Sequence, residues 1–247
     1  MTRTALVTGS TLGLGLAIAE RLLAQGYQVA VSGRKLEDAE QAAKSIDPNG
    51  EKTLALGLDV QDKTAFQSAL SQIKEYFGDC QVLINNAAMT PTTSVMDISA
   101  DEFDQVMSTN LRGTFFGCQV FGSYFAEQNY GRIINMTSLA GQMGGTASGA
   151  HYAASKGGIL TLTKVFARAV ADQGVTVNAV APGPVDMPST WEKVPKEKLE
   201  NIIETMIPVK KMSSSDFIAD MVIMLASENA GCTTGACWDS NGGIFMR

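Results

Sequence analysis

Three side chains in the segment 138–156 could act together on one oxygen atom: Ser138, Tyr152 and Lys156. Tyr152 and Lys156 are four residues apart, so in a helix they lie on one face. A free tyrosine has a pKa near ~10, and a neighbouring ammonium favours the phenolate and lowers that pKa. Tyr152 could then exchange a proton with a substrate oxygen that Ser138 holds by a hydrogen bond. The competing interpretation is an ordinary Tyr–Lys pair on a helix surface.

A glycine-rich turn follows the first apolar run of the chain. Its glycines allow a tight turn and let the backbone approach a phosphate, while the helix that follows offers unpaired N–H groups. The spacing is T-G-x-x-x-G-x-G, which differs from the G-x-G-x-x-G fingerprint. Its place after the first strand of a β-α-β unit predicts dinucleotide binding. The predicted contacts are Gly9, Ser10, Thr11, Leu12, Gly13, Leu14 and Gly15.

The end of the second predicted strand indicates which dinucleotide binds. NAD sites usually place a carboxylate there, whereas this chain has Ser32, Gly33 and Arg34. The guanidinium of Arg34 can pair with a 2′-phosphate, and Ser32 can add a hydroxyl contact. We therefore predict NADPH/NADP+ rather than NAD(H); the alternative is that Arg34 belongs to a solvated turn. Asp59 and Val60 close the third strand, where the carboxylate would meet the adenine amino group or only cap the next helix.

Asparagines mark two further positions. The fourth predicted strand ends in Asn85-Asn86-Ala87-Ala88, where small residues let the chain pass close to a cofactor and the asparagines can tie strand ends together. Asn110 lies at a predicted break in a helical region, where a freed carbonyl could hold a water. Taken singly, these residues are interpreted as structural.

The composition is that of an ordinary globular protein. The chain has 247 residues, 45% hydrophobic and 18% charged, with a net charge of −6. It carries no basic stripe, which argues against a nucleic-acid partner. No apolar run approaches the length of a membrane span. The first strand begins a few residues after Met1, so we expect no signal peptide and a cytoplasmic protein.

The sulfur and imidazole groups restrict the chemistry further. No C-x-x-C pair occurs among Cys80, Cys118, Cys232 and Cys237, so we expect free thiols and no metal site. His151 is the only histidine, which argues against a His-based triad or a His-rich metal site. Its place beside Tyr152 is interpreted as incidental, with substrate contact as the alternative.

Strand-like and helical patterns alternate along the chain and predict a parallel sheet with helices on both faces. The predicted strands are 4–8, 28–32, 53–58, 82–85, 132–136, 175–181 and 237–239. The predicted helices are 14–25, 36–46, 63–77, 100–128 with a break near 110–113, 152–172, 196–205 and 216–226. We predict one α/β domain over 1–247, a doubly wound parallel seven-stranded sheet, with a small substrate lid near 184–206.

Together these residues resemble the short-chain dehydrogenase/reductase family over 8–243. The resemblance rests on the glycine motif, N-N-A at 85–87, Asn110, Ser138, Y-x-x-x-K at 152–156, Asn178, and Pro182-Gly183. It implies a Rossmann-like fold and hydride transfer between a nicotinamide and an alcohol or ketone carbon.

The same resemblance implies a role for each site residue. Tyr152 would be the general acid in reduction, Ser138 would orient the carbonyl, and Asn110 would hold a water of the proton relay. Lys156 would bind the nicotinamide ribose and lower the pKa of Tyr152. Further cofactor contacts are expected from Asn86, Ala87, Tyr152, Lys156, Pro182, Gly183 and Val185.

Three positions depart from the family pattern. Ala88 stands where N-N-A-G has glycine, and Leu12 stands where many NADPH-preferring members carry a basic residue. Met187 takes the place of a threonine near the nicotinamide amide, for which Ser189 is the candidate substitute.

The resemblance also implies a homotetramer, because members of the family commonly assemble through two long helices and the C-terminal segment. The matching segments are about 101–128, 152–172 and 216–247. We expect Ile244, Phe245 and Met246 to be exposed at that interface; the alternative is that the tail folds back onto its own subunit.

The predicted function is NADPH-dependent reduction of a ketone to a secondary alcohol, in a chain similar to the 3-oxoacyl-carrier-protein reductases and related ketone reductases. One alternative is an NAD-dependent dehydrogenase of a secondary alcohol or diol. Another is a non-catalytic nucleotide-sensing or scaffold protein, against which the intact set of four candidate catalytic residues argues. We expect substrate specificity to lie in 89–94, 139–150 and the lid.

Overall fold

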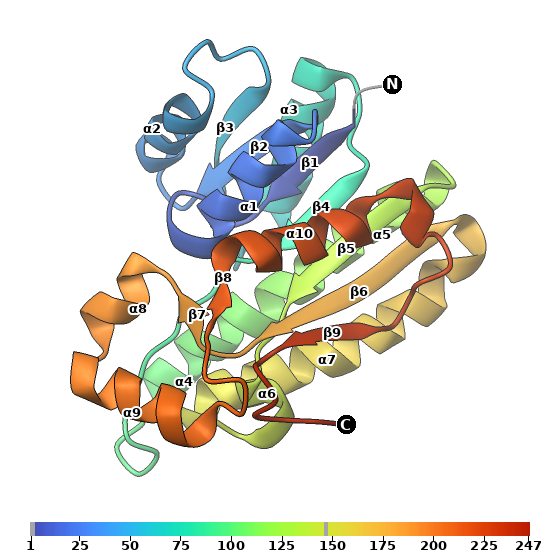
Figure 1. The fold of residues 1–247 in the computed structure, drawn as a ribbon. Helices are drawn as coiled ribbons and strands as arrows, with labels where there is room; N and C mark the ends of the chain where they lie inside the picture. Colours follow the sequence, from blue (N-terminus) through green and yellow to red (C-terminus); the bar gives the residue numbers. More distant parts are fainter. Residues whose placement is uncertain (1–2, 146–147) are drawn as a thin grey trace.

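A sheet of parallel strands forms the centre of the molecule. The structure is a computed structural model that describes residues 3–145 and 148–247. Within these residues the sheet comprises β1 (Thr4–Val7), β2 (Gln28–Gly33), β3 (Thr53–Gly57), β4 (Val82–Asn85), β5 (Gly131–Met136), β6 (Val175–Pro182) and β9 (Cys237–Ser240). The spatial order is β3-β2-β1-β4-β5-β6-β9, and all the pairings are parallel (Figure 1). The predicted doubly wound seven-stranded sheet is confirmed.

Helices cover both faces of this sheet because its central strands are apolar on both sides. One face packs against α1 (Gly13–Ala24), α2 (Leu36–Ile46) and α10 (Ser215–Ala226). The other packs against α3 (Lys63–Phe77), α5 (Gly113–Glu127) and α7 (Ala150–Val170). In Figure 1, α1 and α10 lie in front of the sheet and α7 lies behind it. The second face carries the largest buried rings, from Phe66, Phe121 and Phe125.

The predicted helix break near Asn110 is a widened turn. A π-helix, Met107–Arg112, joins α4 (Ala100–Val106) to α5, so the helical path continues. At Gly113, where α5 begins, a Cβ would lie 2.9 Å from the Val60 side chain. The wide turn and the glycine therefore let the helix pass close to the end of β3, and π-turns of this kind are frequent at functional sites.

Short elements beyond the carboxyl ends of β5 and β6 were not predicted from the sequence. They are α6 (Ala140–Met143), β7 (Val185–Asp186), α8 (Pro188–Lys193) and β8 (Ser213–Ser214). β7 pairs in parallel with β8, which anchors the segment on both sides of α8 and α9 (Lys196–Met206). Leu199 of α9 packs with Ile207 and Met212 in a small separate cluster, whereas Trp191 and Met206 remain 39% and 40% exposed.

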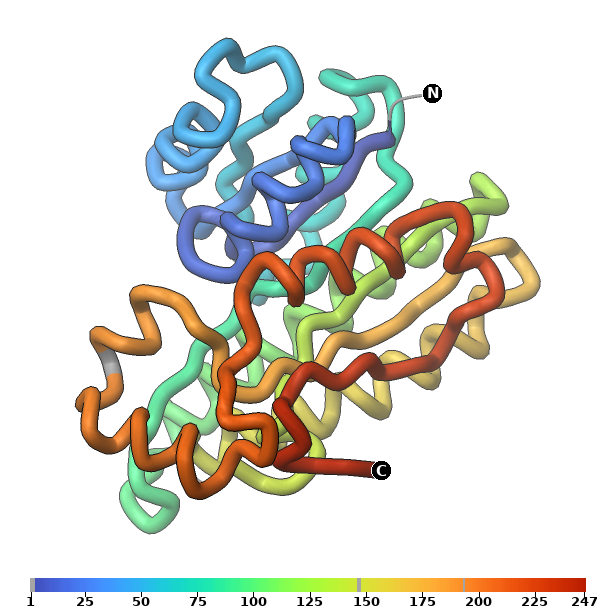
Figure 2. The backbone as a smooth tube through the Cα atoms, in the orientation of Figure 1, coloured from blue at the N-terminus to red at the C-terminus, as the bar shows by residue number. Residues whose placement is uncertain are grey.

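The C-terminal tail folds back onto its own chain. Figure 2 follows it from β9 past the segment 207–212 to its end, and the Val209 N–H donates to the Gly242 carbonyl at 3.2 Å. Ile244 packs on the α9 cluster, and Arg247 pairs with Asp239 at 2.8 Å. The expected exposure of the tail is therefore wrong for Ile244 and Phe245, which are half-buried, and holds for Met246, which is 76% exposed.

Of the helices in the described part of the chain, none is both long and apolar enough to cross a membrane. The four cysteines are free; Cys80 and Cys118 are buried, Cys237 is half-buried and Cys232 is exposed.

Candidate active site

The candidate site residues gather at the carboxyl edge of the sheet. The glycine turn follows β1, Asn86 follows β4, Ser138 follows β5 and Pro182 ends β6. Carboxyl ends of neighbouring parallel strands meet at one edge, which is where open α/β sheets bind ligands. The topology therefore brings together segments that are far apart in the sequence (Figure 1).

Lys156 is a buried cation beside the end of β5. It lies in the second turn of α7, is 3% exposed, and its Nζ donates to the Met136 carbonyl at 2.6 Å. Burial lowers the pKa of Lys156 to about 8, since a charged ammonium is costly away from water. The Nζ also lies 5.7 Å from the centre of the Tyr152 ring, so the two side chains share the predicted face.

Tyr152 differs from the prediction in its electrostatics. Burial raises the pKa of the Tyr152 phenol, and a hydrogen bond with Ser138 only partly offsets that rise. The net shift of this pKa is therefore upward, opposite to the net lowering that was expected. The physical reason is that the ammonium is bound to the Met136 carbonyl, while the phenol is withdrawn from water. Tyr152 is thus held in its protonated form, ready to donate.

Ser138 is positioned by the short helix α6 and by the end of β5. Its hydroxyl accepts from the Ala140 N–H at 3.1 Å, and the preceding Thr137 hydroxyl donates to the Lys156 carbonyl at 2.8 Å. A Cβ on Gly141 would lie 2.5 Å from the Lys156 carbonyl carbon, so this glycine permits α6 to pack directly on α7. Ser138, Tyr152 and Lys156 are therefore brought together as predicted.

Asn110 uses its side chain to fix the loop after β4. Its Oδ1 accepts from the Met89 N–H at 2.7 Å, and its Nδ2 donates to the Met89 carbonyl and to Ser155 Oγ at 3.0 and 3.1 Å. Its backbone carbonyl, in the π-turn, accepts from the Thr114 hydroxyl at 2.8 Å. The fully buried Asn110 thus links the loop to α7, since Ser155 in turn donates to the Tyr152 carbonyl.

The glycine turn is shaped to bring the backbone close to a ligand. Gly9 has φ +62, and a Cβ on it would lie 2.8 Å from Ala87 Cα. A Cβ on Gly15 would lie 2.3 Å from the Gly9 carbonyl oxygen, so only glycine fits there. Asn86 Nδ2 donates to the Thr8 and Gly9 carbonyls, both at 3.0 Å. These contacts hold the turn rigid and tie it to the end of β4.

Two serines of the predicted cofactor site hold the turn from inside. Ser10 and Ser32 are buried, and both hydroxyls donate to the Val7 carbonyl, at 2.8 and 3.1 Å. The Ser10 N–H donates to the Ser32 carbonyl at 2.9 Å, and the Ser32 N–H donates to Ser10 Oγ at 2.9 Å. All four donors are used within the chain. In this structure the Ser10 and Ser32 hydroxyls therefore hold the turn, and their contact with a cofactor stays a prediction.

The residues predicted to meet the adenosine end lie at the protein surface. Arg34 is exposed and, among the described residues, forms no ion pair, so its guanidinium is available. Asp59 is exposed and accepts from the Gln61 N–H at 3.0 Å, whereas Val60 is buried. The alternative that Asp59 caps the next helix is wrong, because Asp62 accepts from the Thr64 N–H at that position.

The end of β6 supplies the other wall. A Cβ on Gly183 would lie 2.9 Å from Asn241 Cα, so Pro182-Gly183 passes tightly against the chain beyond β9. Val185 begins β7, and Met187 precedes α8 with an extended backbone. Asn178 is structural: its Nδ2 donates to the Thr233 carbonyl at 2.6 Å, and its Oδ1 accepts from the Ala236 N–H at 3.1 Å.

These residues fit a nicotinamide dinucleotide. Gly9 and Gly15 let the turn pack closely on its own chain, a Cβ on Gly13 would meet nothing within 4 Å, and no side chain caps the N-terminus of α1. The first N–H groups of that helix are therefore left for an anion. Lys156 lies beside the end of β5 and the Tyr152 ring, where it can hold a ribose.

No sequence pattern indicates the group of residues around His151. This side chain is fully buried, and its Nε2 lies 3.0 Å from Glu102 Oε1. Neither an incidental position nor a substrate contact describes it. Glu102 and Thr93 come from segments distant in sequence, so only the folded chain reveals the group.

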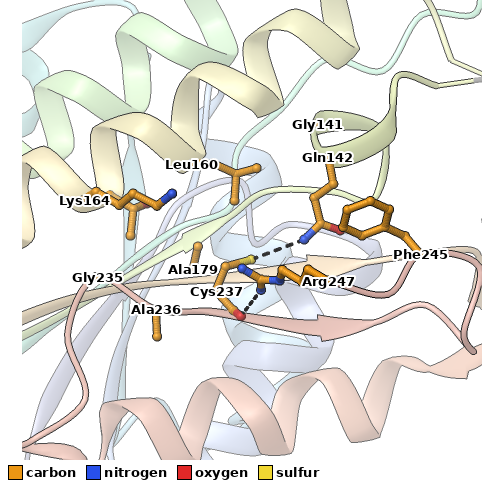
Figure 3. A pocket seen from close by; sticks show the side chains of 11 residues that line it. Gly141, Gln142, Leu160, Lys164, Ala179, Gly235, Ala236, Cys237, Phe245 and Arg247 are labelled. Carbon is orange, nitrogen blue, oxygen red and sulfur yellow. Dashed lines mark hydrogen bonds between the residues drawn. The ribbon is translucent and has the colours of Figure 1, made fainter.

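Two hollows lie apart from Tyr152. One, of about 220 Å³, is enclosed by α6, α7, β9 and the tail; Figure 3 shows Gln142, Phe245 and Arg247 around it. The other, a shallow hollow of about 410 Å³, lies between the π-helix and α7 and is lined mainly by Met107, Leu111, Phe115 and Leu162. Neither contains the candidate catalytic residues.

Comparisons with known proteins agree with this geometry. The family model described as enoyl-(acyl carrier protein) reductase matches residues 9–244. The 3-oxoacyl-[acyl-carrier-protein] reductase FabG of Staphylococcus aureus is 37% identical over 248 residues, covering 100% of this chain and 99% of that protein. The 2-(R)-hydroxypropyl-CoM dehydrogenase of Xanthobacter autotrophicus is 35% identical, covering 96% of each. A crystal structure of a short chain dehydrogenase from Bacillus anthracis superposes with a TM-score of 0.89 at 30% identity, covering 99% of this chain and 97% of that one.

The chain therefore belongs to the short-chain dehydrogenase/reductase family. It is an oxidoreductase that acts on CH–OH and C=O groups with a nicotinamide cofactor.

Proposed function

We propose that the protein reduces a ketone to a secondary alcohol with NADPH, and that the substrate is a 3-oxoacyl compound or a related ketone. The observation that carries the proposal is the group formed by half-buried Ser138 and Tyr152 and buried Lys156, at the edge of the sheet that also carries the glycine turn. The family relationship to 3-oxoacyl reductases supports the substrate class.

Two side chains, Ser138 and Tyr152, act on the carbonyl oxygen of the substrate. Ser138 donates a hydrogen bond that orients the substrate, and the protonated Tyr152 delivers a proton to the same oxygen as negative charge develops there. The Lys156 ammonium stabilises the phenolate that remains. Asn110 anchors the adjoining loop, and its backbone carbonyl would hold a water of the relay that restores the proton. When bound, the nicotinamide supplies the hydride.

NADPH is proposed because the end of β2 offers a cation and no carboxylate. Arg34 is exposed and available for a 2′-phosphate, and Gly33 leaves the approach open. The proposed backbone cradle consists of Gly9, Thr11, Leu12, Gly13, Leu14 and Gly15, with Asn86, Ala87, Asp59, Val60, Pro182, Gly183 and Val185 around it.

The substrate would enter beneath the lid, 184–206. This segment starts directly beyond the end of β6 and carries the exposed side chains of Trp191 and Met206. A panel of β-keto esters, acyl thioesters, aryl ketones and diketones, read by nicotinamide absorbance with both cofactors, tests the proposal. Reduction of at least one ketone with NADPH is expected. No change in nicotinamide absorbance with any compound of the panel would contradict the proposed function.

Oxidation of a secondary alcohol with NAD is the second candidate. It is favoured by the relationship to a hydroxyalkyl dehydrogenase that covers 96% of both chains. Secondary alcohols and cyclic diols, offered with NAD and NADP, belong in the same panel. Faster turnover of these alcohols with NAD than of any ketone with NADPH would favour the dehydrogenase over the reductase.

We also propose a homotetramer joined through α5 and α7. The shallow apolar hollow between the π-helix and α7 and the 52% exposed Val165 support an interface there. The tail is held by its own subunit, so the sharper test is Val165→Glu, with Tyr76→Glu on α3 as the matched exposed control. Light scattering should show weaker assembly only for the first; a monomeric parent would refute the tetramer.

A further inference from the structure

The loop after β4 is attached at three places to the elements that carry the candidate catalytic residues. At its start, Asn110 binds both the N–H and the carbonyl of Met89. In its middle, the Gly149 N–H donates to the Pro91 carbonyl at 3.0 Å, just before α7 begins. The third attachment, at Thr93, runs through two further side chains and reaches the neighbour of Tyr152.

That third attachment is a chain of two hydrogen bonds on one carboxylate oxygen. The Thr93 hydroxyl donates to Glu102 Oε1 at 2.6 Å, and His151 Nε2 lies 3.0 Å from the same atom. An ionised carboxylate only accepts, so Nε2 must carry the proton. Both partners lower the pKa of Glu102, Thr93 more than His151, which keeps the acceptor ionised.

The imidazole is built into this position. His151 is 0% exposed, and within residues 3–145 and 148–247 its Nδ1 has no hydrogen-bond partner. Leaving a buried acceptor unsatisfied is costly, so the Nε2 bond must hold the ring against that penalty.

Gly149 shows the same tight fit from the other side. It has φ −62 and ψ 152, which any residue can adopt, yet a Cβ there would lie 2.2 Å from His151 Cε1. The glycine is therefore explained by the space that the ring occupies.

We propose that His151 is a positioning residue: through Glu102 and Thr93 it fixes the segment 89–93 against the first turn of α7, and so sets the substrate-facing wall beside Tyr152. Because His151 directly precedes Tyr152 in the chain, its ring ties the loop to the helix turn that presents the phenol. The proposal rests on the proposed carbonyl reduction for its kinetic consequences, whereas its structural consequence is independent of activity.

Four variants separate positioning from general stability. Thr93→Val removes only the loop hydroxyl, and His151→Leu removes the donor. His151→Gln keeps an N–H at a similar reach and should rescue. Thr176→Val is the matched control, because it removes a buried hydroxyl that has no partner among the described residues, at the opposite end of β6.

The first readout is hydrogen–deuterium exchange of the peptide 86–99, which needs no substrate. Thr93→Val and His151→Leu should speed exchange of the amides at 89–93 other than Pro91 by roughly tenfold or more, the effect of one lost bond to a charged acceptor. His151→Gln and Thr176→Val should exchange like the parent. Parent-like exchange rates in both Thr93→Val and His151→Leu overturn the proposal. It is also overturned if the amides of His151→Gln exchange as fast as those of His151→Leu.

The second readout is steady-state ketone reduction, together with NADPH binding followed by fluorescence. The two disrupted variants should raise KM for the ketone by roughly five- to tenfold, with kcat and the NADPH Kd changed by less than about threefold. Unchanged KM in both variants overturns the proposal. A parent that reduces no ketone refutes the proposed function instead, and the exchange experiment then decides the positioning role by itself.

Discussion

The ammonium nitrogen of Lys156 lies 2.6 Å from the carbonyl oxygen of Met136, and this contact holds a buried positive charge at the end of β5. The carbonyl dipole satisfies one donor, while burial lowers the pKa of the amine to about 8. The charge that would stabilise a Tyr152 phenolate is thus present below about pH 8 and is lost as the pH rises through that value.

The first prediction concerns this pH dependence. With NADPH saturating, kcat/KM for ketone reduction should be highest below about pH 8 and should fall above it, because Lys156 loses its charge there. The raised pKa of Tyr152 keeps its phenol protonated across the same range, so titration of Tyr152 does not cause the fall in kcat/KM above pH 8, the alkaline limb of the profile. Lys156→Arg, which cannot lose its charge, should abolish the limb even if its activity is lower. A parent profile that stays flat above pH 9, or a limb that survives in the arginine variant, would contradict the assignment.

Cofactor choice should depend on Arg34. A charge-assisted pair with a phosphate contributes roughly 1.5–3 kcal/mol, so Arg34→Leu should weaken NADPH binding about tenfold or more and leave NADH binding unchanged. Lys35→Leu, an adjacent exposed cation, is the control. Gly33 is best left unchanged, since a Cβ there would lie 2.5 Å from Thr11 Cγ2. Equal losses for the two cofactors, or for the two variants, would refute a specific phosphate contact.

The glycine turn should tolerate no side chain at Gly15. A Cβ at this position would lie 2.3 Å from the Gly9 carbonyl oxygen and 2.4 Å from Asn86 Nδ2, so the turn must open. Gly15→Ala should weaken dinucleotide binding at least about tenfold, by the loss of backbone donors aimed at the phosphates. Gly122→Ala is the control, because a Cβ there makes an ordinary 3.7 Å contact with Ile133. Fluorescence titration with NADPH checks both; tight binding by Gly15→Ala would show that the cradle lies elsewhere.

Much of the fold could be predicted because its strands are short apolar runs and its helices have strong periodicity. The strand Val82–Asn85 and the helix Lys63–Phe77 were predicted with the bounds that the structure gives. Asn110 was placed correctly at an irregular turn, although the π-helix keeps the helical path intact. The local pattern could not show that the turn widens rather than breaks, since packing of Gly113 on Val60 decides it.

The site features that the sequence did not show depend on tertiary surroundings. The direction of the Tyr152 pKa shift follows from burial, which no spacing of residues reports. Ser32 ends an apolar strand as a surface contact would, yet its hydroxyl points inward to Val7. The sequence predicts an exposed tail because it does not show that Arg247 pairs with Asp239. That ion pair forms only in the folded chain.

The most direct test of the central claim is turnover by Tyr152→Phe, measured beside its affinity for NADPH. The substitution removes only the phenolic O–H and keeps the ring, so the cofactor cradle and the core should be unaffected. If Tyr152 delivers the proton to the ketone oxygen, turnover should fall at least about 100-fold while the NADPH Kd stays within about twofold of the parent. Turnover within a few-fold of the parent, on a ketone that the parent reduces, would contradict the account.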